Sequence, residues 1–165
     1  DPSRSLAEYD VARDLWLNRG QMREALDHAL TAINLDDENA EAAHLAALIY
    51  LDFCRQSADA CRLEEAERAF RDAAALNPSL YQAHYNLGIV LRRLNRWPES
   101  VDSFRAAHAL APQDPDAWDY LYAGLMRLRR IEEAAQAFAA WEPVAPECPV
   151  LASSTICQMG AGVTA

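Results

Sequence analysis

Large and small apolar side chains recur along this chain in one order, and that order returns after about 34 residues. When the segment that begins at Tyr81 is set above the one that begins at Pro115, five of the seven matched places agree in kind. In the first segment these places hold Leu87, Gly88, Leu91, Ser100, Phe104, Ala107 and Pro112, and in the second they hold Leu121, Tyr122, Leu125, Ala134, Phe138, Trp141 and Pro146. Each copy therefore predicts a pair of antiparallel helices that pack through one apolar face.

Two further copies lie upstream, one starting near Leu6 and the other near Ala40. They place apolar residues at Ala12, Trp16, Ala25, Ala29 and Ala32, and at Ala46, Ala47, Tyr50, Ala66, Phe70, Ala73 and Pro78. The second of these copies is about seven residues too long, and its surplus falls between the two helices. We expect one repeat domain over 1–148, with repeats near 6–39, 40–80, 81–114 and 115–148, an insertion at about 53–62, and a tail or partial capping helix over 149–165.

Small residues recur where the two helices of a copy must cross, because close backbones leave no room for large side chains. The expected crossing pairs are Ala12 with Ala25, Ala46 with Ala66, and Gly88 with Ser100. Tight turns are expected at Gly20, Asn95 and Arg129, of which only the glycine is favoured in such a turn. Proline ends the second helix at Pro78, Pro112 and Pro146, whereas Pro98 falls in the first turn of a helix, where its missing N–H costs little.

On these residues the chain resembles the tetratricopeptide repeat (TPR) family from about Leu6 to Pro146. The resemblance implies an all-α solenoid of about four helix-turn-helix repeats, wound as a right-handed superhelix, with a short C-terminal tail. It also implies a non-enzymatic module that binds a segment of another protein in its concave groove. One repeat cannot bury its apolar face alone, so the repeats are expected to stack.

In TPR proteins the first helix of each repeat lines the groove, and those places here give an apolar stripe among charges. The resemblance assigns the groove to Leu17, Leu48, Leu51, Tyr85, Ile89, Arg92, Arg93, Met126 and Arg127, with Asp10, Asp14, His44, Asp52 and Asp119 around them. An amphipathic helix or an extended hydrophobic segment is the expected ligand. Two alternatives stay open: the tail from Pro149 onward fills the groove, or the stripe serves self-association of the chain.

The net charge of −10 argues against a nucleic-acid partner, because phosphates are repelled by an acidic protein. All 15 basic residues are arginine, so the chain lacks the lysines with which TPR chaperone receptors hold a C-terminal carboxylate. A local basic cluster comprises Arg92, Arg93, Arg96, Arg127, Arg129 and Arg130. It is either solvated surface or a site that holds an acidic stretch of a partner. No apolar run approaches the roughly 20 residues needed to cross a membrane.

The four cysteines fall as two local pairs, Cys54 with Cys61 and Cys148 with Cys157. Bridges within these pairs would place the chain in an oxidising compartment, whereas four free thiols would fit the cytosol. The sequence leaves the connectivity open. Neither pair has the short CxxC spacing of structural zinc sites, and the four histidines are scattered. We therefore expect no metal, no cofactor and no enzymatic activity.

A narrower resemblance covers roughly Leu17 to Leu91, where the chain looks like the TPR lipoproteins that act as pilotins for type IV pilus secretins. It implies a bacterial assembly factor in the periplasm, held at the inner face of the outer membrane by a lipid on an upstream cysteine, with an outer-membrane secretin as partner. The chain starts at Asp1 and not at a methionine, so we expect that a segment was removed from its front. Whether that segment held a signal or lipid anchor stays open. The alternative is a monomeric cytosolic TPR adaptor or co-chaperone-like scaffold.

Overall fold

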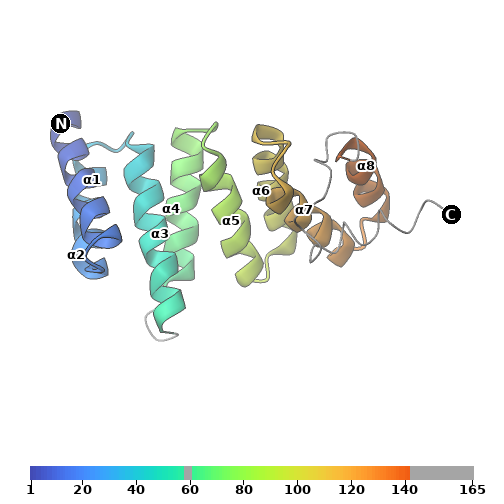
Figure 1. Ribbon diagram of the computed structural model, residues 1–165, viewed down its shortest axis with the longest axis horizontal. Coiled ribbons are helices and arrows are strands. Elements are labelled where there is room, and N and C mark those ends of the chain that lie inside the picture. The colour runs from blue at the N-terminus through green and yellow to red at the C-terminus, as the bar shows by residue number, and fades with distance from the viewer. Residues whose placement is uncertain (58–60, 142–165) are drawn as a thin grey trace.

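The computed structural model describes residues 1–57 and 61–141 of the chain, and this part contains only α-helices as regular elements (Figure 1). In chain order the helices are α1 (Pro2–Leu17), α2 (Met22–Leu35), α3 (Ala40–Gln56), α4 (Leu63–Leu76), α5 (Tyr81–Arg93), α6 (Trp97–Leu110), α7 (Pro115–Arg127) and α8 (Ile131–Trp141). They form four hairpins that stand side by side in a row, as the stacked repeats predict (Figure 1). The all-α solenoid expected from the sequence is confirmed.

Short polar side chains and prolines set the starts of several helices. Side-chain oxygens accept backbone N–H groups in the first turns of α1, α3 and α7. They belong to the Asp1 carboxylate, the Asn39 amide and the Asp114 carboxylate, respectively. Proline occupies the first turn of α1, α6 and α7, which confirms the placement of Pro98. Because the Asp1 cap precedes Pro2, the first helix starts earlier than the Leu6 at which the repeat pattern begins.

Three of the hairpins turn through one residue in the left-handed backbone conformation, as expected. The φ angles are 66° at Gly20, 64° at Asn95 and 57° at Arg129. After each of these residues the next N–H donates back to the last turn of the preceding helix. Gln21 donates to the Leu15 carbonyl, six residues back, and Arg96 donates to the Leu91 carbonyl, five residues back, both at 2.9 Å. The second hairpin differs because α3 has 17 residues where α5 and α7 have 13. Residues 53–56 of the expected insertion are therefore part of α3.

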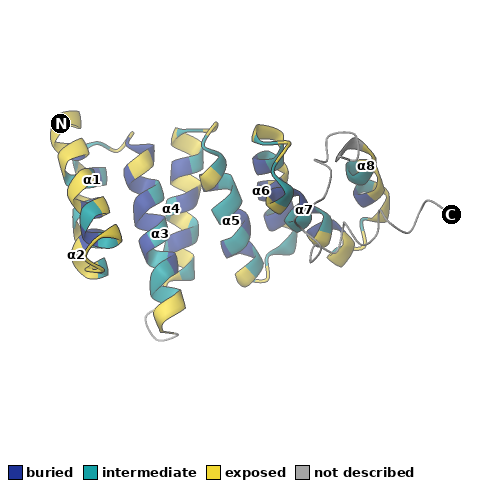
Figure 2. Ribbon diagram, viewed as in Figure 1, coloured by how far each residue is buried: buried dark blue, intermediate teal, exposed yellow. Residues whose placement is uncertain are grey.

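The core consists of small clusters at the junctions between successive helices. Most of its large side chains belong to α3 to α7, and the buried residues of these helices are dark blue in Figure 2. At one crossing the Ser100 hydroxyl donates to the Gly88 carbonyl at 2.9 Å, and a Cβ on Gly88 would lie 2.8 Å from the Phe104 ring. The expected pair of Gly88 with Ser100 is thus confirmed. In the second hairpin Ala66 shares a cluster with Ala47, whereas its expected partner Ala46 lies in the cluster that contains Ala25 of the first hairpin.

A buried polar group joins the first hairpin to the second. The Ser5 hydroxyl donates to the Ala32 carbonyl at 2.8 Å and accepts from the Asn39 amide at 2.9 Å. The amide oxygen of Asn39 accepts the Ala42 N–H at 2.8 Å, so one asparagine caps α3 and fixes α1 beside it. These bonds satisfy polar groups that would otherwise be costly to bury.

Candidate partner-binding surface

The residues assigned to the groove differ in how far they are accessible. Leu17 is 62% exposed on α1, Met126 on α7 is also exposed, and so are the residues Arg93 and Arg127. Half-buried side chains occupy the remaining accessible places, namely Leu48 of α3 and Tyr85, Ile89 and Arg92 of α5.

Leu51 does not belong to an accessible groove, because only 3% of it is exposed. Its side chain lies in the cluster that contains Phe70 of α4 and Leu87 of α5. The matched place in α5 carries Arg92, which keeps its charged end at the surface. An apolar side chain at this place instead packs inward against the neighbouring repeat, so the assignment of Leu51 to the groove is wrong.

An aromatic surface lies across α5 and α7. The Tyr85 ring meets the Phe104 ring edge to face at 5.8 Å and the Tyr120 ring at 5.9 Å, while Phe104 and Tyr120 stack at 5.0 Å. Arg92 places its guanidinium 4.6 Å from the centre of the Tyr120 ring. We call the half-buried residues Tyr85, Ile89, Arg92 and Tyr120 the α5–α7 surface. Tyr120 was missed by the sequence analysis because it lies one place beyond the position that lines TPR grooves.

Phenol groups on this side of the molecule are held in their neutral form. Burial, with Tyr120 and nearby carboxylates, raises the pKa of Tyr85 to about 12. The Tyr81 hydroxyl donates to the Asp114 carboxylate, and burial together with this bond raises the pKa of Tyr81 far above its ordinary value.

The predicted basic cluster is partly neutralised within the molecule. Arg96 donates to the Glu67 carboxylate at 2.6 Å and to Glu99 at 2.7 Å, and Arg130 donates to Glu133 at 2.5 Å. Arg127 lies over the Trp97 ring at 4.8 Å. Among the residues that the structure describes, Arg93 and Arg129 make no ion pair. Arg92, Arg93, Arg127 and Arg129 are the members that remain available to a ligand.

Comparison with known proteins gives a family for part of the chain. Residues 81–114 match the tetratricopeptide repeat family. No curated protein matches the chain. Among solved structures, the first TPR of Spaghetti (RPAP3), bound to the HSP90 peptide SRMEEVD, has 20% identity and a TM-score of 0.68 over 78% of this chain and 96% of that chain. MamA has 17% identity and a TM-score of 0.71 over 87% of this chain and 80% of that chain.

Another structural neighbour is an enzyme. It is a mutant O-GlcNAc transferase of Thermobaculum terrenum, with 24% identity and a TM-score of 0.60, and it is matched over 74% of this chain but only 22% of its own. At these identities the structural matches establish a shared TPR fold. They leave the ligand of this chain to be argued from its own residues.

The expected groove residues of the first two hairpins include a bonded carboxylate and a histidine that is largely buried. Asp52 accepts the Trp16 indole N–H at 2.9 Å and an Arg55 N–H at 2.8 Å. His44 lies 5.7 Å from the Phe70 ring, and its buried Nε2 has no hydrogen-bond partner within the described residues. Burial lowers the pKa of His44. The α5–α7 surface offers both aromatic area and an arginine without a carboxylate partner among the described residues.

The buried histidines should make the TPR fold sensitive to mild acid. Burial lowers the pKa of both His44 and His108, so the unfolded chain binds protons more readily than the folded one as the pH falls through the ordinary histidine range of about 6.5. The free energy of unfolding is thus expected to be highest above that range and to fall between pH 7.5 and 5.5. Urea denaturation at both pH values should show a smaller fall of the free energy of unfolding in a His44→Leu/His108→Leu variant than in the wild type. An equal fall would show that these two histidines do not cause the acid sensitivity.

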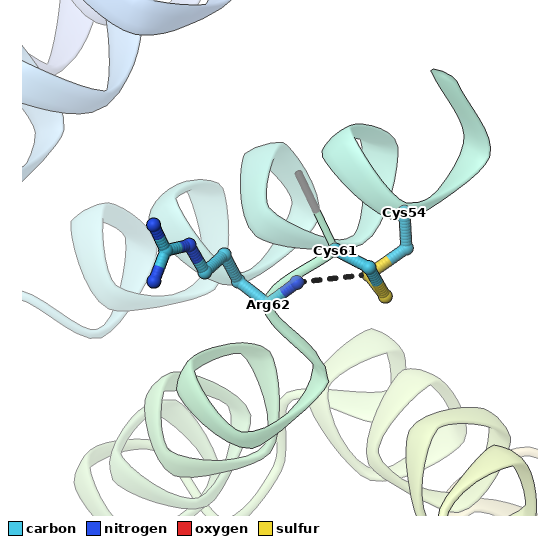
Figure 3. Close-up of a disulfide and its surroundings, with 3 residues drawn as sticks. All are labelled: Cys54, Cys61 and Arg62. Carbon is cyan, nitrogen blue, oxygen red and sulfur yellow. Dashed lines mark hydrogen bonds between the residues drawn. A yellow bond between two sulfur atoms is a disulfide. The ribbon is translucent and has the colours of Figure 1, made fainter. Parts of the chain in front are cut away.

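Cys54 and Cys61 are paired across the end of the second TPR hairpin (Figure 3). The Cys54 sulfur also accepts the Arg62 N–H at 3.1 Å, just before α4 begins. The other expected pair, Cys148 with Cys157, lies outside the described residues. Within 1–57 and 61–141, no three His, Cys, Asp or Glu side chains are placed to hold a metal ion. No helix in these ranges is both long and apolar enough to cross a bilayer.

Proposed function

We propose that this protein is a non-enzymatic interaction module that binds a segment of another protein on the α5–α7 surface. The observation that carries the proposal is the joint placement of Tyr85, Ile89 and Tyr120, all only half-buried, beside the guanidinium of Arg92. Rigid aromatic side chains with a polar end, next to arginine, are the groups that contribute most to binding energy in protein interfaces. The Spaghetti TPR and the second TPR of human RPAP3, bound to the HSP70 peptide SGPTIEEVD, carry peptides on the same fold.

The ligand we propose is an amphipathic segment with apolar side chains and at least one carboxylate. Its apolar side chains would cover Ile89 and the tyrosine rings, and its carboxylate would pair with Arg93 or Arg127, which are exposed. A free C-terminal carboxylate is a poorer candidate. The chain has no lysine, and acidic Asp10 and Asp119 occupy two of the places where TPR carboxylate receptors bind.

Peptide selection on the purified protein tests this function. Displayed random peptides selected on the wild type should be enriched in apolar and acidic residues, and the affinity of the best peptide can be measured by calorimetry. Ile89→Glu should weaken it at least tenfold, because a carboxylate would stand among the rings and repel the ligand's own. Leu110→Glu is the matched control, since Leu110 is 42% exposed on α6. Equal affinity of the two variants, or failure to select any peptide, would refute the proposal.

As the specific partner we propose a type IV pilus secretin, with the protein in the periplasm at the inner face of the outer membrane and tethered by an upstream lipid. The support is the pilotin-like sequence from about Leu17 to Leu91, together with the Cys54–Cys61 pair, which suits an oxidising compartment. We further propose that the unbound protein is a monomer. A purified secretin fragment should bind the wild type and not Ile89→Glu. Light scattering over a range of concentrations separates this from self-association, in which the mass would grow with concentration.

A further inference from the structure

The fourth residue of the first helix changes in size from one repeat to the next. It is Ala43 in α3, His84 in α5 and Trp118 in α7. Trp118 is only 1% exposed. The centre of its ring lies 6.1 Å from that of the His108 ring of α6 and 5.4 Å from that of the Tyr122 ring. The same place therefore carries side chains of very different size in successive repeats.

The two earlier repeats leave matching pockets beside this place. His84 lines one of about 270 Å³ together with Ser103 and Ala106 of α6. Ala43 lines the other pocket, of about 320 Å³, together with Ala69 and Asp72 of α4. Ala69 and Asp72 are the seventh and tenth residues of α4, as Ser103 and Ala106 are of α6. The same junction thus occurs twice, with a histidine in one copy and only a methyl group in the other.

The two pockets differ in chemistry. In the pocket beside His84, Arg71 and Glu99 form an ion pair at 2.6 Å, so its charges are already satisfied. The pocket beside Ala43 has apolar walls, formed by Ile33 of α2 and by Ala69, Ala75 and Leu76 of α4. Leu76 is 41% exposed at its edge.

Two carboxylates stand at the apolar pocket, Asp37 after α2 and Asp72 on α4. Both are exposed, and neither forms an ion pair within the described part of the chain. An apolar cavity next to uncompensated negative charge complements a bulky apolar side chain that is followed or preceded by a cation. A volume near 300 Å³ is at the lower limit of ligand pockets, so it suits one or two side chains of a peptide.

We propose that the pocket between α2 and α4, floored by Ala43, is a second docking site, which takes a partner segment with a bulky apolar side chain flanked by arginine or lysine. It is built from other helices than the α5–α7 surface and selects the opposite charge. The protein can thereby hold two different segments at once. This proposal does not depend on the proposed function of the α5–α7 surface.

The chain itself supplies the variant that tests the site. Ala43→Trp places in the second repeat the residue that the fourth repeat already accommodates at Trp118, and it should fill the pocket while the helices remain folded. Ala43→His copies the third repeat and should fill the pocket partly. Circular dichroism verifies the fold of each variant, so that loss of binding can be separated from loss of structure.

The probes are two fluorescein-labelled ten-residue peptides in a glycine–serine background, one with phenylalanine between two arginines and one with phenylalanine between two glutamates. Fluorescence anisotropy with the full chain should show saturable binding of the arginine peptide and at least tenfold weaker binding of the glutamate peptide. Ala43→Trp should weaken the arginine peptide at least tenfold, Ala43→His by a smaller factor, and Asp72→Asn three- to tenfold.

Two controls separate the pocket from general attraction to an acidic protein and from the other surface. Glu132→Gln removes one exposed charge on α8 and should change the affinity less than twofold, as should Ile89→Gln in the α5–α7 surface. The proposal is overturned if folded Ala43→Trp or Ala43→His binds as tightly as the wild type, if Glu132→Gln matches Asp72→Asn, or if the arginine peptide does not saturate. An effect of Ile89→Gln equal to that of Ala43→Trp would place the peptide in the α5–α7 surface instead.

Discussion

Replacing Phe104 by alanine should lower the free energy of unfolding by about 3 to 5 kcal/mol, the usual cost of removing a buried aromatic ring. Phe104 is 1% exposed and stands at the centre of the packing between the third and fourth repeats. Its ring stacks on Tyr120, meets Tyr85 edge to face, and leaves no room for a Cβ on Gly88. Urea denaturation followed by circular dichroism at pH 7.5 measures the loss.

Leu110→Ala is the control for this prediction, because Leu110 lies on the same helix and is 42% exposed. It should cost less than about 0.5 kcal/mol, as for most surface changes. Phe104→Ala should also weaken peptide binding at the α5–α7 surface, since Tyr85 and Tyr120 lose the ring that holds them apart at a fixed angle. Equal midpoints for the two alanine variants would show that the aromatic set is not the core of this junction.

Opening the Cys54–Cys61 bridge should lower the free energy of unfolding by about 2 to 3 kcal/mol, the loop-entropy value for so short a ring. The two cysteines are seven residues apart and join the end of α3 to the start of α4. In the loop-entropy account the bridge acts by restricting the unfolded chain, so the expected loss does not depend on any one contact of the folded protein. Urea denaturation with and without a phosphine reductant measures it.

A Cys54→Ser/Cys61→Ser variant serves as the control, because it should match the reduced wild type and should not respond to reductant through this pair. Mass spectrometry of freshly isolated protein after thiol alkylation should find Cys54 and Cys61 unlabelled. Labelling of both would remove the support for an oxidising compartment and would favour the cytosolic adaptor.

The repeat pattern was sufficient to predict the hairpins and their turns. Asn95 and Arg129 were expected in tight turns only because they stand where the pattern ends one helix and begins the next, and both adopt positive φ. The close approach of Gly88 and Ser100 followed from their small size alone. These features are local, since each depends on residues within one repeat.

The accessible surface followed less closely from the pattern. Leu51 and Arg92 hold the same place in successive repeats, yet one is buried and the other forms part of the candidate site. Arg96 and Arg130 belong to the basic cluster of the sequence, yet both are paired with glutamates in the fold. Tyr120 was absent from the expected groove although its ring lies against both Tyr85 and Arg92.

The sequence by itself determined the helices, their pairing into hairpins and the TPR solenoid, because every repeat must bury the same small and large residues at the same crossings. Tertiary structure alone decided which side chains remain at the surface and which spaces between repeats stay open. Ala43 and Trp118 illustrate the reason, since the same place is open in one repeat and filled in another. The contacts of a residue between two repeats depend on the sizes and charges of residues in the next repeat. A pattern that describes one repeat contains no information about those residues.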